Sequence, residues 1–150
     1  MFKNILVPVD GSSTAHQAIE KAVAMAQAFQ GNVALVYVID PYAFTGVGTD
    51  FAYGQAEYLA AATAEGNDAI ASARQVFASK GIPVTSSVVE GHAVYKGILD
   101  TATSTGADLI VMGSHGRKGL EKLVLGSVAS QVLSNAHLPV LIVREPSEKS

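Results

Sequence analysis

The hydrophobic residues fall into two kinds of run, which alternate along the chain. Short runs rich in β-branched residues, such as Asn4 to Val9, are uniformly apolar, as strands buried on both faces of a sheet require. Longer stretches repeat apolar residues at helical spacing, as Ile19, Val23 and Ala26 do. The predicted strands cover residues 4–9, 33–39, 83–89, 108–112 and 139–143, and the predicted helices cover residues 15–29, 55–79, 92–105 and 128–135.

Three places depart from this regular pattern. Residues 42–53 hold glycines and aromatic residues with little periodicity, so they are predicted to form a mobile loop. Gly66 stands near the middle of the predicted helix 55–79, where glycine weakens a helix. Pro83 opens the third strand, and proline suits the start of a strand or the edge of a sheet.

Strands that alternate with helices predict an α/β fold, in which helical crossovers connect parallel strands. Right-handed crossovers place helices on both faces of an open, Rossmann-like sheet of five parallel strands. The pattern alone does not give the order of the strands. In such sheets ligands bind beyond the carboxyl ends of the strands, where the strand order reverses. We therefore expect the residues that carry chemistry to lie just after strands.

Length and composition limit the possible classes of protein. A chain of 150 residues has the size of one domain, predicted over residues 1–145 with a polar tail over residues 146–150. The formal net charge is −3 and there is no block of basic residues, which argues against a nucleic-acid partner. No apolar stretch approaches the ~20 residues that span a bilayer, and no cleavage site follows the N-terminus. Membrane insertion is not expected, and the cytoplasm is the expected location.

The residues suited to metal binding are few. The chain has no cysteine, so neither a disulfide framework nor a thiolate site is available. The four histidines stand at positions 16, 92, 115 and 137, without the spacing of metal ligands. No metal site in the protein itself is therefore predicted.

A glycine-rich segment follows the fourth predicted strand. Gly113 and Gly116 are followed, ten residues later, by Gly126-Ser127, which gives the pattern G-x2-G-x9-G-S. Glycines let backbone N–H groups turn toward an anion and approach it closely. Gly126 and Ser127 stand at the start of a predicted helix, where unpaired N–H groups and the helix dipole favour phosphate. The alternative is that the glycines form only a tight turn and a helix start.

Other polar residues near predicted strand ends are weaker candidates. Asp10 follows the first strand and could accept hydrogen bonds from ribose hydroxyls, or it could simply form the turn. Arg117 and Lys118 could neutralise phosphate charge, or they could be solvated. His115 is expected to shape the loop through hydrogen bonds rather than to act as a base, and Asp40 is expected to cap the chain before Pro41.

Three stretches of the chain resemble the universal stress protein family. They are NILVPVDGS near the N-terminus, LVYVID after the first helix, and VMGSHGRKGLEKLVLGSVASQVLSNAHLPVLIVR in the last third. The resemblance implies a five-stranded parallel sheet with strand order 3-2-1-4-5. It also implies ATP binding, because the chain carries the complete G-x2-G-x9-G-S motif of the family's ATP-binding subset. Neither a Walker A loop nor a G-x-G-x-x-G fingerprint is present.

The resemblance also implies roles for particular residues. The main chain of Pro8 and Val9 and the side chain of Asp10 would meet adenine or ribose, and Val38 would lie against the base. The remaining residues would contact the ribose and the phosphates: Met112, Gly113, Ser114, His115, Gly116, Arg117, Lys118, Gly126, Ser127 and Val128.

The expected function is that of an ATP-binding regulatory or stress-response module, with Mg²⁺ as a possible companion of the phosphates. Hydrolysis needs an activated water and groups that stabilise the transition state, and the sequence offers no convincing base, so no catalytic residue is assigned. The alternatives are a slow ATPase and a sensor of another adenine nucleotide such as cyclic AMP. A regulatory protein partner is also expected. The apolar strand Pro139 to Val143 would form an edge, and the resemblance implies a homodimer joined there; the alternative is that the tail Glu145 to Ser150 caps this edge.

Overall fold

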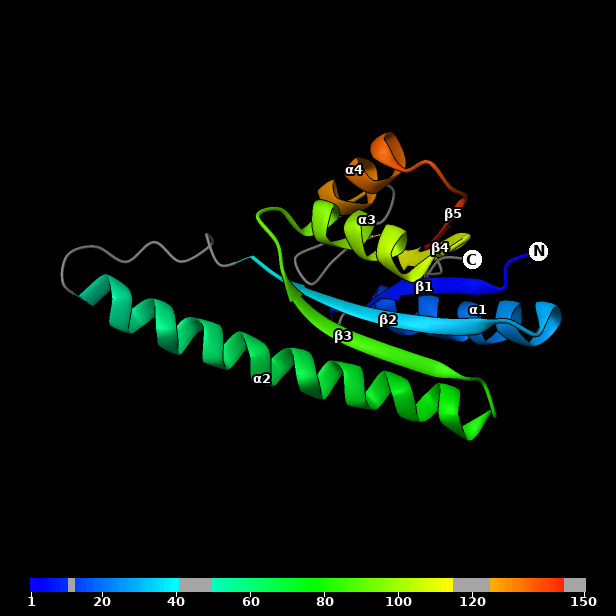
Figure 1. Cartoon of the computed structure of the whole chain (residues 1–150), viewed down its shortest axis with the longest axis horizontal. Helices are drawn as coiled ribbons and strands as arrows, with labels where there is room; N and C mark the ends of the chain where they lie inside the picture. The colour runs from blue at the N-terminus through cyan, green and yellow to red at the C-terminus, as the bar shows by residue number, and fades with distance from the viewer. Residues whose placement is uncertain (11–12, 41–49, 115–124, 145–150) are drawn as a thin grey trace, which may run out of the picture.

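The computed structural model describes residues 1–10, 13–40, 50–114 and 125–144. Strands and helices alternate along these residues (Figure 1). The elements are β1 (Asn4–Pro8), α1 (Ser13–Phe29), β2 (Asn32–Ile39), α2 (Asp50–Ser79), β3 (Val84–Glu90), α3 (Val94–Thr105), β4 (Leu109–Gly113), α4 (Ser127–Asn135) and β5 (Val140–Val143).

The strands form one parallel sheet with the order β3-β2-β1-β4-β5. The central strand β1 pairs with β2 on one side and with β4 on the other, so that Ile5 lies between Val33 and Leu109. Both the α/β fold and the expected strand order are confirmed. The order reverses between β1 and β4, because the chain builds outward through β2 and β3 before it crosses to β4. The edges are β3 and β5, which agrees with the proline that opens the third strand and with the family's strand order for the last one.

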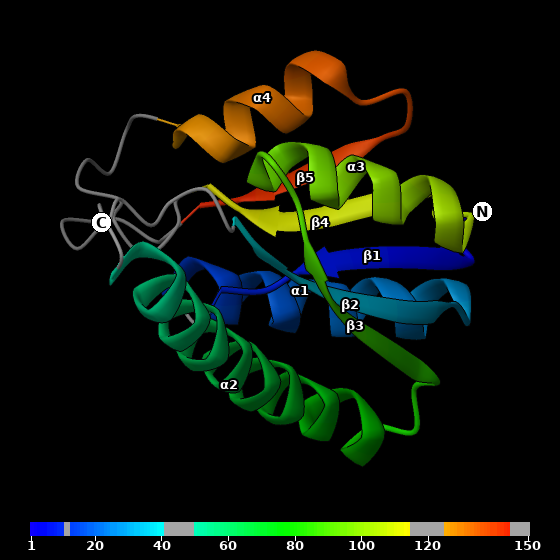
Figure 2. The ribbon, with the colours of Figure 1, turned by 60° about the vertical axis from the view of Figure 1, so that its left-hand side comes forward.

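Helices cover both faces of the sheet, α1 and α2 on one face and α3 and α4 on the other (Figure 2). Successive side chains of β1 point to opposite faces of the sheet. Ile5 and Val7 pack toward α1 and α2, and Leu6 packs toward α3 and α4. All three side chains are fully buried. Burial of one such side chain stabilises the folded protein by about 1.5–3 kcal/mol. The sheet is therefore held between two apolar layers, one on each face.

Helix α2 is longer at its start than the sequence predicted. Residues 50–53 are helical, so the predicted loop over residues 42–53 is wrong at its C-terminal end, and residues 42–49 lie outside the described part of the chain. Over residues 54–60, the exposed positions Ala56, Glu57 and Ala60 are interspersed with half-buried ones, and none is fully buried. A helix that extends beyond the strands in this way (Figure 1) lacks the apolar periodicity by which a helix is recognised.

Gly66, which weakened the sequence prediction of α2, has a packing role. It is buried, and a Cβ at this position would lie 2.7 Å from Cδ1 of Tyr37 in β2. The absence of a side chain lets the helix lie directly against the tyrosine ring. The remaining boundaries differ from the predicted ones by one or two residues; α3, for example, begins at Val94 rather than at His92.

The amino ends of the strands are joined by specific hydrogen bonds. The Asp108 carboxylate, just before β4, accepts the backbone N–H groups of Lys3 (2.9 Å) and Asn4 (3.1 Å), which lead into β1. Helix α3 ends as predicted at Gly106, whose φ of 68° is left-handed and whose N–H group bonds to carbonyls of the last turn. At this end of the sheet, groups of the chain itself accept these backbone hydrogen bonds.

Candidate functional site

The two halves of the glycine motif meet at the carboxyl end of β4. Ser114, which directly follows the last residue of β4, donates its backbone N–H to the carbonyl of Val143 at 2.9 Å. The carbonyl of Ser114 in turn accepts the N–H of Gly126 at 2.8 Å, although twelve positions separate the two residues in the sequence. Ser114 is 1% exposed. The start of α4 is therefore fixed against the end of β4, beside the point where the strand order reverses.

Helix α4 begins without a side-chain cap. Its N-cap residue is Gly126, with φ −65° and ψ 161°, and within the described part of the chain no side-chain cap bonds to the first turn. The first N–H groups of a helix have no intrahelical partner, and with the helix dipole they favour an anion. Ser127 is exposed at the first position of the helix, where its hydroxyl can add a donor.

Several predicted contact residues share one face of the sheet. Met112, Val38 and Val128 belong to the apolar layer under α3 and α4. Pro8, two positions beyond Leu6 in β1, lies on this face by the alternation of the strand. The structure therefore brings the ends of β1, β2 and β4 and the start of α4 to one side of the sheet.

The side chain of Val9 faces the other way. It is buried in the layer under α1 and α2, where it lines a small cavity of about 190 Å³ with His16 and Ser72. Its N–H donates to the carbonyl of Val36 at 2.9 Å. Neither the side chain nor the N–H of Val9 is therefore directed to the α3 and α4 face as a free group. Asp10, the next residue, is half-buried at the same end of the sheet.

Part of the predicted site lies outside the described residues. His115, Gly116, Arg117 and Lys118 belong to the segment 115–124, so their predicted roles stay predictions. Within the described ranges there is no group of three or more metal-ligating side chains. Among the same ranges no helix is long and apolar enough to cross a membrane.

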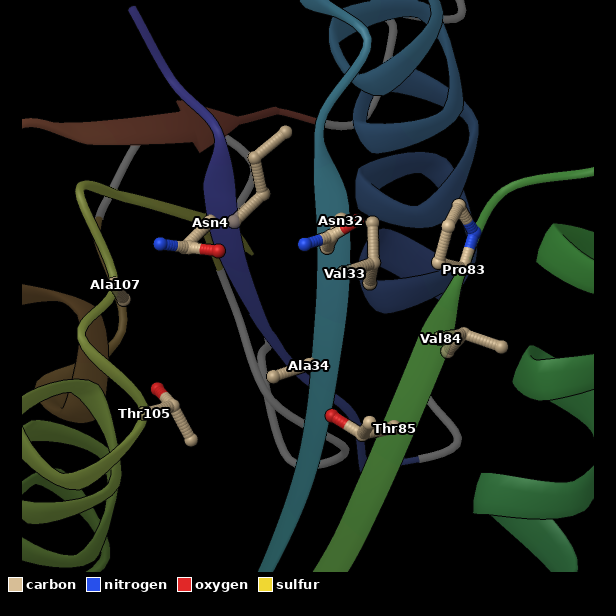
Figure 3. A pocket seen from close by; sticks show the side chains of 10 residues that line it. Asn4, Asn32, Val33, Ala34, Pro83, Val84, Thr85, Thr105 and Ala107 are labelled. Carbon is tan, nitrogen blue, oxygen red and sulfur yellow. The ribbon is translucent and has the colours of Figure 1, made fainter.

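A half-open hollow of about 490 Å³ lies at the opposite end of the sheet (Figure 3). Asn4 and Asn32 stand at the first positions of β1 and β2, and Thr85 and Thr105 add hydroxyl groups from β3 and the end of α3. All these residues mark amino ends of strands or the carboxyl end of a helix. The hollow is therefore separate from the residues that the glycine motif predicts.

Sequence reasoning missed the contacts behind Val38. Gly97, in α3, is buried directly against this valine, and Gly91 lies beside it. The sequence carried one signal of this contact: a glycine inside a predicted helix, where local propensity disfavours it. At the same end of the sheet, the Tyr58 hydroxyl of α2 donates to the carbonyl of Asp40 at 3.3 Å and ties α2 to the end of β2.

The sheet order and the fixed start of α4 define a doubly wound α/β protein with its candidate site at the switch point. The family model described as Universal stress protein family matches residues 1–144. The chain belongs to the universal stress protein family.

Individual relatives match almost the whole chain. Universal stress protein MJ0531 of Methanocaldococcus jannaschii is 34% identical over 99% of this chain and 86% of its own length. The solved structure of MJ0577, from the same organism, has a TM-score of 0.87 at 29% identity and covers 99% of both chains. A universal stress protein solved in complex with cAMP has a TM-score of 0.61 at 25% identity, covering 95% of this chain and 97% of its own.

Proposed function

We propose that the protein binds ATP at the carboxyl end of the sheet and acts as a nucleotide-dependent regulatory module. The observation that carries the proposal is the hydrogen bond from Gly126 N–H to Ser114 O, which joins the two halves of G-x2-G-x9-G-S. The phosphates would lie at the uncapped start of α4, held by the backbone N–H groups of Ser127 and Val128 and by the Ser127 hydroxyl, while Gly126 has no side chain to block their close approach.

The adenosine part would lie on the α3 and α4 face, toward β1 and β2. Val38 and Met112 are the apolar side chains there, and Pro8 ends the central strand. The base would pack against Val38, while the Asp10 carboxylate would accept hydrogen bonds from the ribose hydroxyls. The main-chain contact of Val9 would be made by its carbonyl oxygen, because its N–H already donates to the carbonyl of Val36.

The segment between the two halves of the motif completes the proposal. Gly113 and Ser114 lead into it, and His115, Gly116, Arg117 and Lys118 would wrap the ribose and phosphates, with the two cations offsetting phosphate charge. Mg²⁺ would be held by the phosphates rather than by a protein cluster. The described residues offer no such cluster of ligands.

A binding module fits this residue set better than a fast enzyme does. The motif supplies phosphate donors and cations but no group placed to activate a water. Slow ATP hydrolysis is the alternative. Ordinary enzymes turn over about ten substrate molecules per second. Hydrolysis of ATP faster than about one per second would favour a catalytic function over the regulatory one. The regulatory role goes with a cytoplasmic location and a partner protein that reads nucleotide occupancy.

A second adenine nucleotide is a specific competitor of ATP. A structural relative of this chain was solved in complex with cAMP, and the same apolar wall would accept its base. Competition of labelled ATP with cyclic AMP separates the two. Displacement of the label at a lower concentration of cyclic AMP than of ATP would make cyclic AMP the preferred ligand.

The dimer proposal rests on the difference between the two sheet edges. Edge strand β5 is entirely apolar, and Leu141 is 37% exposed on it, whereas edge strand β3 carries polar residues such as Thr85 and Ser86. An apolar edge is usually paired or covered, and we propose that two copies meet along Pro139 to Val143. Leu141→Asp should convert the dimer to a monomer in analytical ultracentrifugation, and a wild-type monomer at high concentration would refute the dimer.

Thermal unfolding with and without Mg-ATP tests the central proposal. Ligand at a hundred times its dissociation constant adds about 2.7 kcal/mol to the free energy of unfolding, which raises Tm by several degrees for a chain of this size. Because bound nucleotide can be carried through purification, the sample is also denatured and analysed for released ATP. No rise in Tm together with no released nucleotide would refute ATP binding.

A further inference from the structure

Helix α3 meets strand β2 through a glycine. A Cβ at Gly97 would lie 2.7 Å from Cγ1 of Val38, closer than real Cβ atoms come to a neighbour, and 3.0 Å from its Cγ2. Gly97 is buried on the sheet-facing side of α3, one turn before Thr101, whose hydroxyl donates to the Gly97 carbonyl at 2.8 Å. The helix backbone therefore lies directly on the valine side chain.

A second glycine lies on the same valine. A Cβ at Gly91, just after β3, would lie 3.3 Å from Cγ1 of Val38 and 3.4 Å from the Cα of Gly97. Val38 is β-branched, so its side chain has one preferred rotamer and cannot easily move aside. Two glycine backbones thus fix the position of this side chain, even though alanine is the better helix former at position 97.

Val38 is also placed to meet a ligand. It lies two residues before Asp40 at the carboxyl end of β2, on the α3 and α4 face, and it is only partly buried. Part of its surface is covered by Gly91 and Gly97, and the remainder is left at the end of the sheet where the proposed nucleotide site lies.

We infer that Gly97 is a positioning residue for the base: by keeping α3 free of a side chain opposite Val38, it sets the wall against which adenine packs. This inference rests on the proposed function. It assigns base recognition to the α3–β2 contact, separately from phosphate binding at the start of α4.

A matched pair of variants tests the inference. Gly97→Ala and Gly66→Ala add the same methyl group to buried helical glycines, and in each case the new Cβ would lie 2.7 Å from the nearest carbon, of Val38 and of Tyr37 respectively. These two side chains face opposite sides of β2. Gly97→Ala should weaken ATP binding about tenfold, measured by calorimetry on the folded protein, and Gly66→Ala should leave it within about twofold. Equal losses in both variants would overturn the inference.

A comparison in a Val38→Ala background keeps the test valid if Gly97→Ala alone does not fold. Val38→Ala removes both methyl groups that the new Cβ would meet. In the Val38→Ala background, Gly97→Ala should therefore cause no further loss of ATP affinity. A further loss would mean that Gly97 acts through something other than Val38, and would overturn the inference.

Methyl NMR of the wild-type protein separates this inference from the proposed function. Adenine packed on Val38 should shift the methyl resonances of Val38 at saturating ATP, because the base is aromatic, while the amides of Gly126 and Ser127 report the phosphates. Shifts at Gly126 and Ser127 without any change at Val38 would overturn the inference and leave ATP binding standing. No change at either place, in protein stripped of nucleotide, would refute both.

Discussion

The two ends of the sheet are built in opposite ways. At the amino end, Asp108 accepts two backbone N–H groups and Gly106 closes α3 with a left-handed cap. At the carboxyl end, α3 and α4 begin at Ala93 and Gly126, and neither helix has a side-chain cap. A serine, threonine or aspartate cap adds about 1 kcal/mol relative to alanine. The amino end is therefore completed by hydrogen bonds within the chain, whereas among the described residues the starts of α3 and α4 have no side-chain cap.

This contrast predicts that variants at the two ends separate binding from stability. Changes at the carboxyl end should lower nucleotide affinity with little effect on the unliganded fold. Changes at the amino end should lower the free energy of unfolding without changing affinity. The variants below are ordered by the size of the expected effect.

Gly126→Val should have the largest effect. The φ of −65° and ψ of 161° at Gly126 suit valine, so the fold should persist, while the new side chain blocks the close approach of phosphate. The stabilisation of about 2.7 kcal/mol expected at a hundredfold excess of ATP over its dissociation constant should disappear. Thermal unfolding with and without Mg-ATP measures this loss, and an undiminished rise in Tm would place the phosphates elsewhere.

Asp108→Ala should act on stability alone. It leaves two backbone N–H groups without their carboxylate acceptor and should lower the free energy of unfolding by about 1–2 kcal/mol. Chemical denaturation measures this change, and calorimetry with ATP supplies the companion value. A parallel fall in ATP affinity would break the proposed separation of the two ends.

Gly106→Ala should cost about 1 kcal/mol through the backbone. A Cβ here would meet no atom within 4 Å, so the whole cost comes from the left-handed φ of 68° rather than from a steric clash. Denaturation curves for this variant and the wild type give the difference. An alanine variant as stable as the wild type would show that the end of α3 rearranges at little cost.

Ser127→Ala should have the smallest effect, a loss of about threefold in ATP affinity, at the low end of what one hydrogen bond contributes. Ser134→Ala is the matched control, because it makes the same change on an exposed position near the other end of α4. Calorimetry on both variants measures the difference. If the two bind ATP equally well, the Ser127 hydroxyl does not contact the phosphates.

Sequence reasoning predicted the sheet because its signals are local. The apolar runs of the strands and the periodic faces of α1 and α3 locate these elements to within one or two residues. The start of α2 was missed because residues 50–54 hold a glycine and aromatic residues with little apolar periodicity. Strand order came from the family resemblance, since parallel strands joined by helices give no local record of their neighbours.

The candidate site was predictable only in part. Spacing gave the glycine motif, but the bond between Ser114 and Gly126 joins residues that only the fold brings together. The packing of Gly97 on Val38 depends on the distance between two elements far apart in sequence, which no periodicity encodes. The resemblance assigned only the main chain of Val9 to the ligand, and the alternation of the strand turns its side chain to the other face.

Residue-resolved amide NMR of nucleotide-free protein titrated with Mg-ATP tests the central claim most directly, because both ends of the sheet report in one experiment. The account predicts shifts at Gly113, Gly126, Ser127 and Val128 and unchanged signals at Gly106 and Asp108. Shifts gathered instead around the amino-end hollow at Asn32 and Thr85, or no shifts at all, would contradict it.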